Sequence, residues 1–287
     1  MNAREVIALA LQASIIVTVF GFGLKATRED VLYVFERPMH LVRSVLAMFV
    51  IMPVIAVVLA QSFDFRHPVE VALVALAISP VPPLLPRKHK KAGGQVSYGL
   101  GLMVTMAVLS LAFIPLALHL LGLFYDKSYA TPPAAIAKIV FTAAVLPLLA
   151  GMLCGRLFPK RAQAIAAPAI LVGKFLLPIA GVAILIAAHR ALGALLGDGT
   201  LVAIVVFVAI ALVVGHALGG PDPEERGVLA LSTACRHPGI AIAIATANAA
   251  DPNDHQSSAA IMLYLVVSII ATVPYVRWQS RRLDPPN

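Results

Sequence analysis

The stretch AGGQVSYGLGLMVTMAVLSLAFIPLALHLLGLFY, residues 92–125, decides the fold because it contains no Asp, Glu, Lys or Arg. A helix needs about 20 consecutive apolar residues to cross a hydrocarbon core roughly 30 Å thick. This run exceeds that length, and several other runs in the chain reach it. The sequence therefore predicts an all-α, polytopic membrane protein and argues against a soluble enzyme.

Composition supports the same class. Hydrophobic residues make up 60% of the chain and charged residues 13%, about half of the roughly 25% typical of soluble domains. No segment is polar enough to form a separate soluble domain, so we expect a single membrane transporter domain over residues 1–287. The net charge of +8 does not indicate nucleic acid as a partner, because the basic residues sit in short loops between apolar runs. Cys154 and Cys235 fit neither a metal site nor a disulfide framework, and we expect no cofactor.

Uncharged runs separated by charged or proline-rich breaks predict about nine transmembrane helices. The expected spans are Val6–Leu24, Val42–Phe63, Val69–Leu85, Ala92–Tyr125, Pro133–Leu157, Ile165–Ala188, Gly199–Gly219, Gly227–Ala250 and Gln256–Val276. Their boundaries carry an uncertainty of several residues.

The distribution of Lys and Arg predicts the orientation. If the N-terminus lies outside, the inside loops collect 15 of the 22 basic residues and the outside loops 5. Lys174 and Arg236 fall within spans. Cytoplasmic loops carry an excess of Lys and Arg. We therefore expect a multi-pass protein of the inner (plasma) membrane with a cytoplasmic C-terminus. The dense basic group Arg87–Lys91 has two explanations. It marks a cytoplasmic loop that contacts anionic lipids, or it attracts anionic substrates from the cytoplasm.

Two spans are interrupted. The third ends in SPVPPLLP, residues 79–86, and the eighth contains RHPG, residues 236–239. Proline cannot continue a regular helix, and unwound backbone at membrane depth is tolerated only inside protein or beside a water-filled cavity. Breaks at corresponding positions of two halves indicate a transporter binding site. We expect repeats over about residues 1–125 and 130–278; two unrelated proline kinks are the alternative.

The chain resembles the bile acid:sodium symporter family. The resemblance rests on Gly21–Leu24, Arg37-Pro38 with Met48–Pro53, Ser79-Pro80, Ala92–Val96 and Arg236–Ala241, where spacing matches better than identity. It implies two inverted repeats, a core domain in which two broken helices cross, and a panel domain that moves against it. The first helix of that pattern would be absent here.

The positions that match the family's sodium ligands carry other residues. Ser232 stands for a Glu and Arg236 for a Gln, and the remaining replacements are Leu85, Pro86, Gly99, Met103 and Met48. The resemblance therefore implies the fold and transport, while the residues argue against sodium coupling.

Arg236 is the main candidate for substrate binding. A mid-span Arg is energetically expensive and normally faces the bundle interior with a partner or a function. Its planar fork of five donors suits carboxylate, sulfonate or phosphate. Pro238 can open a new half-helix whose N-terminus favours an anion. The alternative is a structural Arg that bonds to carbonyls freed at the broken third span and replaces sodium with its own charge.

The other candidates surround the breaks or lie mid-span. His237 is expected to shuttle protons or to serve as hydrogen-bonded structure. Ser79, Ser232 and Thr233 are expected to bond substrate or to satisfy freed backbone groups. Lys174 either faces the cavity as a second cation or snorkels to the interface.

The sequence therefore predicts a secondary transporter of a small organic anion that works by alternating access without sodium. An uncoupled facilitator or exporter, and a receptor or sensor that retains the fold, are the alternatives. The predicted spans contain no interior carboxylate, and no catalytic motif is recognised, so we do not expect an enzyme. The expected partners are an anionic small molecule, the lipid bilayer and a coupling proton.

Overall fold

The computed structural model describes residues 3–63, 65–82, 91–125, 133–187, 193, 195, 199–248 and 256–283. These residues form helices and their connections, and no strand occurs among them. The helices of the first part are α1 (Ala3–Lys25), α2 (Arg28–Phe35), α3 (Pro38–Val45), η1 (Leu46–Ile51), α4 (Met52–Ser62), α5 (His67–Ile78) and α7 (Val96–Tyr125). Those of the second part are α8 (Pro133–Val140), η2 (Phe141–Val145), α9 (Leu146–Leu157), α10 (Pro159–Ala187), α12 (Thr200–Leu218), α13 (Pro223–Ala234), α14 (Pro238–Ala247) and α15 (Gln256–Leu283).

The all-α, polytopic membrane fold is confirmed. Six helices in the described part are long and apolar enough to cross a membrane: Pro38–Ser62, Val96–Leu123, Ala137–Leu157, Thr200–Leu218, Pro223–Ala247 and Gln256–Leu283. Two further apolar helices, Gln12–Lys25 and His67–Ile78, are shorter. Each expected span overlaps one or more of the helices between α1 and α15, and nine membrane crossings remain a prediction.

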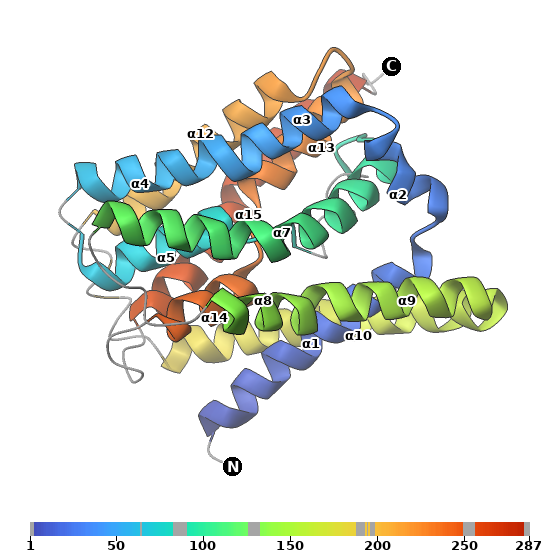
Figure 1. The fold of residues 1–287 in the computed structure, drawn as a ribbon, viewed down its shortest axis with the longest axis horizontal. Coiled ribbons are helices and arrows are strands. Elements are labelled where there is room, and N and C mark those ends of the chain that lie inside the picture. The colour runs from blue at the N-terminus through green and yellow to red at the C-terminus, as the bar shows by residue number, and fades with distance from the viewer. Residues whose placement is uncertain are drawn as a thin grey trace.

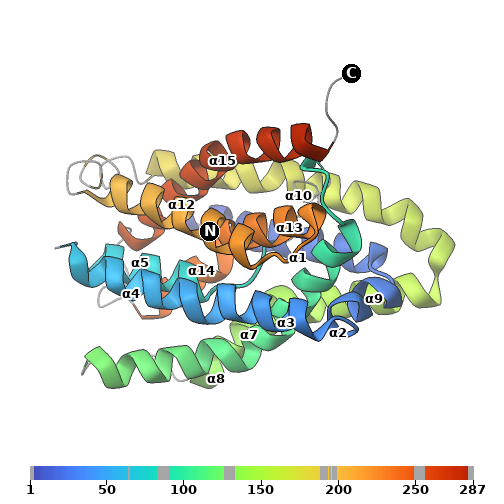
Figure 2. The ribbon, with the colours of Figure 1, turned by 90° about the horizontal axis from the view of Figure 1, so that it is seen from above.

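The helices form two layers (Figure 1). In the smaller layer α1 packs along α10 and α9. In the larger layer α5 packs against α4, α14 and α15, and α12 packs against α13 and α15. Figure 2 shows where the layers meet, with α15 beside α10 along one edge and α7 beside α8 along the other. The short helix α2 connects the layers and packs against α7.

Small residues allow the helices of the smaller layer to approach closely. A methyl group at Gly23 would collide with the Leu148 carbonyl, and one at Gly151 would collide with the Phe20 carbonyl. Transmembrane interfaces use small residues in this way, because helix association in lipid depends on van der Waals packing. The paired glycines therefore fix the contact between α1 and α9.

Two prolines explain the π-helical segments. Pro53 follows η1 and Pro147 follows η2, and the residue four positions before each proline lies within the π-helix. In an α-helix the proline ring would clash with the carbonyl of that residue, and widening to i→i+5 bonding relieves the clash. Both helices continue past the proline, so each π-segment is a local adjustment within one long helix.

The interruption of the third and eighth spans is confirmed. Helix α5 ends at Ile78, and Ser79 is extended. Helix α13 ends at Ala234, and α14 begins with Pro238 at its first turn, as the sequence predicted. The group Arg87–Lys91 lies outside the described residues apart from Lys91, and Leu85 and Pro86 lie outside them as well.

Candidate functional site

The two broken segments lie side by side and hydrogen-bond to each other. The His237 N–H donates to the Pro80 carbonyl at 3.0 Å and to the Ser79 hydroxyl at 3.2 Å. Ser79 in turn donates its hydroxyl hydrogen to the Leu76 carbonyl at 2.8 Å. Backbone groups that the breaks release from the helices are thus paired across the crossover. This pairing is what buried backbone requires where water is absent.

Arg236 lies at the centre of this crossover and is 1% exposed. Its Nη1 donates to the Ser79 carbonyl at 3.2 Å and its Nη2 to the Met48 carbonyl at 3.1 Å. Among the described residues, no Asp or Glu oxygen lies within ion-pair distance of the guanidinium. Its Nε has no hydrogen-bond partner there. The structure therefore has the carbonyl-bonded arrangement that was one of the two alternatives for this residue.

The Met48 carbonyl is available because of Pro53. In the π-helical register the Met52 N–H donates to the Ala47 carbonyl. The next carbonyl, that of Met48, would accept from residue 53, but proline has no N–H. The Arg236 guanidinium supplies the missing donor. This partner was not predicted, although Met48-Phe49-Val50-Ile51-Met52-Pro53 contains the signal.

Tyr264 on α15 completes the crossover and was also missed by the sequence analysis. Its hydroxyl accepts from the Arg236 N–H at 3.0 Å and donates to the Ala234 carbonyl at 2.7 Å. Its ring packs edge-on against Phe207. A buried tyrosine usually finds a hydrogen-bond partner for its hydroxyl. The signal in the sequence was a tyrosine near the middle of an uncharged span.

The remaining predicted residues divide into three groups. His237 caps α14, where its Nδ1 accepts from the Ile240 N–H at 3.3 Å, and its buried Nε2 has no partner among the described residues. Thr233 is buried and donates to the Leu229 carbonyl within its own helix, and Ser232 is fully buried beside it. Lys174 is part of α10, but its side chain lies outside the described residues.

A cleft of about 1140 Å³ lies apart from the crossover, where α1, α2, α9 and α10 end or begin. Its lining includes Lys25, Arg28 and Arg156, together with apolar side chains such as Leu24 and Met152, and contains no acidic residue. Apolar walls beside three cations suit an amphipathic anion. The crossover and this cleft are therefore two separate places where cationic side chains lie.

The sequence model of the sodium bile acid symporter family matches residues 13–212, which is more than half of the 287-residue chain. The chain belongs to the sodium bile acid symporter family. The matched region includes the first break at Ser79, while Arg236 and the second break follow it. No match is found among curated proteins. Family membership makes the chain a multi-pass membrane protein related to transporters of bile-acid-like or organic anion substrates.

Proposed function

We propose that the chain is a secondary transporter of a small organic anion that works by alternating access without sodium. The observation that carries this proposal is the Arg236 guanidinium bonded to the Met48 and Ser79 carbonyls at the crossover. Positions 48 and 236 are two of those where the family resemblance placed sodium ligands. A fixed internal cation thus takes the place of the mobile one.

The electrostatics disfavour a sodium ion at the same place. Hard cations prefer carboxylate, carbonyl and hydroxyl oxygens. Two carbonyls that would be suitable ligands already accept hydrogen bonds from Arg236. Two unit charges about 4 Å apart repel by roughly 4 kcal/mol at an effective dielectric of 20, which corresponds to about a thousandfold in affinity.

The nature of the substrate follows from charge and shape. The family is named for bile acids, which are amphipathic anions. The cleft with Lys25, Arg28 and Arg156 among apolar walls supports the same kind of ligand. We propose that Arg236 acts mainly as the internal cation. Arg236 is 1% exposed here, so it could contact the substrate directly only in another conformation that exposes its side chain.

The test has two steps. A thermal-shift screen of organic anions on the purified protein identifies a ligand, with taurocholate as the first compound. Uptake of that ligand into proteoliposomes is then measured in sodium and in choline at constant pH. We expect uptake that changes less than twofold on replacement. A fall of tenfold or more, restored by millimolar sodium, would overturn sodium independence, and binding without uptake would favour the receptor or sensor alternative.

A further inference from the structure

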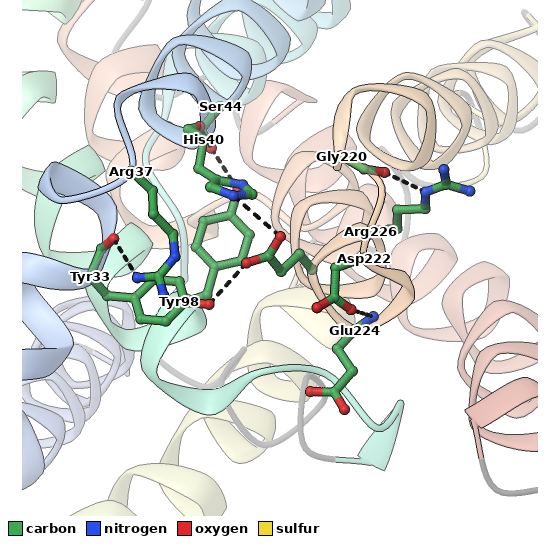
Figure 3. Close-up of polar contacts among 10 residues, drawn as sticks. Tyr33, Arg37, His40, Ser44, Tyr98, Gly220, Asp222, Glu224 and Arg226 are labelled. Carbon is green, nitrogen blue, oxygen red and sulfur yellow. Dashed lines mark hydrogen bonds and ion pairs between the residues drawn. The ribbon is translucent and has the colours of Figure 1, made fainter.

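A second polar cluster lies where α2, α3, α7 and α13 meet (Figure 3). Glu225, in the first turn of α13, is 6% exposed. One of its carboxylate oxygens accepts from the Tyr33 hydroxyl at 2.9 Å, and the other lies 3.3 Å from Nε2 of His40. The sequence analysis expected no interior carboxylate because it began the eighth span at Gly227, whereas the helix begins at Pro223.

Further groups surround this carboxylate. The Tyr98 ring of α7 lies edge-on to His40, and its hydroxyl is 2.9 Å from that of Ser44. Arg37 lies over the Tyr33 ring at 3.9 Å. The charged and titratable groups nearest the pair are thus Tyr33, Arg37, Arg43 and Tyr98. On the other elements packed against α13, His216 of α12 interacts electrostatically with Arg226 of α13 and with Arg282 of α15.

Hydrogen-bond chemistry fixes where the hydrogens lie. Burial, together with the bond to Glu225, raises the pKa of Tyr33 to about 12, so its hydroxyl remains a donor at neutral pH. An ionised carboxylate can only accept, so Nε2 of His40 must carry a hydrogen. The neutral imidazole then has a bare lone pair on Nδ1. This atom is buried and has no partner among the described residues.

We propose that His40 and Glu225 form a proton-binding site that couples transport to proton uptake. Hydronium transfers a proton to Nδ1 of His40: an N–H bond forms, an O–H bond of hydronium breaks, and water is released. The net charge of the pair then changes from −1 to 0. Imidazole is the side chain that ordinarily takes up a proton between pH 5 and 8. The two side chains are 15% and 9% exposed, so solvent reaches part of the pair, although Nδ1 itself is buried.

The location of the pair gives the proton a mechanical effect. Helix α2, which carries Tyr33, connects the two layers, and α13 leads directly to Arg236 at the crossover. Proton binding strengthens the attraction between His40 and Glu225 and thereby holds α3 and α2 against α13. Loss of the proton weakens that contact, which joins the connecting helix α2 to the larger layer through Tyr33 and Glu225. The coupling role rests on the proposed function, whereas proton binding itself does not.

The experiment observes the proton and the contact without any substrate. Nitrogen-15 histidine spectra of the protein in nanodiscs are recorded from pH 8 to pH 5, with His40→Gln to assign the signal. Deuterium exchange of residues 28–36 is followed over the same range, corrected for intrinsic rates. Glu225→Gln tests the pair, and Glu70→Gln is the matched control, because His67 and Glu70 form an exposed pair at 3.4 Å.

We expect Nε2 of His40 to carry a hydrogen throughout this range and Nδ1 to gain one as the pH falls. We also expect exchange in α2 to be about tenfold faster in Glu225→Gln at pH 6 and unchanged in Glu70→Gln. A hydrogen bond to a charged group commonly accounts for a tenfold step or more in an equilibrium constant. A single His40 tautomer throughout, or equal α2 exchange in parent and Glu225→Gln, would overturn the proposal.

Failure of the proposed function would look different. If no organic anion binds or is taken up, transport is refuted while the His40 signal still titrates. If an anion is taken up but His40 never gains its second proton, transport stands and the proton site is refuted.

Discussion

Arg236 shows at the residue scale how far a sequence can lead. A mid-span Arg beside a proline break indicates a site, because its charge must be compensated somewhere. The Ser79 carbonyl was foreseeable, since a broken helix leaves carbonyls unpaired. The Met48 carbonyl was not, because it depends on a π-helical register and on the three-dimensional approach of η1. Tyr264 and the pair His40–Glu225 depend on contacts between segments that only the fold brings together.

The first prediction concerns the charge of Arg236. Arg236→Gln removes the internal cation and restores the residue type that the family resemblance places at this position. We expect sodium to stabilise this variant by roughly 2–4 °C relative to choline at equal ionic strength, because a ligand that binds only the folded state raises the Tm. The parent protein should show no sodium-specific shift.

Arg236→Lys is the matched control, because the ammonium keeps the positive charge near the same carbonyls. Its Tm should be insensitive to sodium, like that of the parent. Equal responses of the parent and of Arg236→Gln to sodium would refute the idea that the guanidinium replaces the ion.

At the element scale, the sequence predicted the long helices well because length and lack of charge are sufficient to define them in a membrane. Helix α2 was missed because eight residues with mixed polarity do not resemble a span. Its start was nevertheless marked by a capping box, in which Thr27 and Asp30 bond to each other's backbone N–H groups. The start of α13 was marked likewise by Asp222 as N-cap and Pro223 in the first turn.

The second prediction concerns the contact between α1 and α9. Gly151→Ala places a methyl group against the Phe20 carbonyl, which is backbone and cannot move aside easily. Overpacking of this kind typically costs about 1–3 kcal/mol. We expect a lower Tm in detergent by several degrees, measured by thermal unfolding of the purified protein.

Gly193→Ala serves as the control for this substitution, because a methyl group there meets no atom of the described residues within 4 Å. It should leave the Tm unchanged or raise it slightly, since alanine reduces the freedom of the unfolded chain. If Gly151→Ala is as stable as Gly193→Ala, the close approach of α1 and α9 is not what holds the smaller layer together.

At the scale of the whole molecule, the sequence predicted the membrane class and the two breaks, and the structure confirms both. The division into two inverted repeats and the number of crossings remain predictions. The crossing of the broken segments, seen in the packing of α5 with α14, was expected through the family resemblance, whereas the packing of α1 with α9 and α10 was not predicted. Periodicity identifies an apolar helix in a membrane, but nearly uniform hydrophobicity does not show which face meets which neighbour.

The third prediction is the orientation, with the N-terminus outside and the C-terminus in the cytoplasm. Basic residues occur at the C-terminal ends of α1, α9 and α15 and in α2 and α3. In Figure 1, α2 and the end of α9 lie toward one side of the molecule, and the end of α4 and the start of α5 lie toward the other. The side with the basic residues should face the cytoplasm, because Lys and Arg resist translocation.

Alkaline phosphatase, which is active only outside the cytoplasm, is fused after Phe63 and, separately, after Lys91. High activity is expected after Phe63 and low activity after Lys91. The reverse result would invert the protein and place His40 and Glu225 on the outer side, so that the proposed site would take its proton from the opposite compartment.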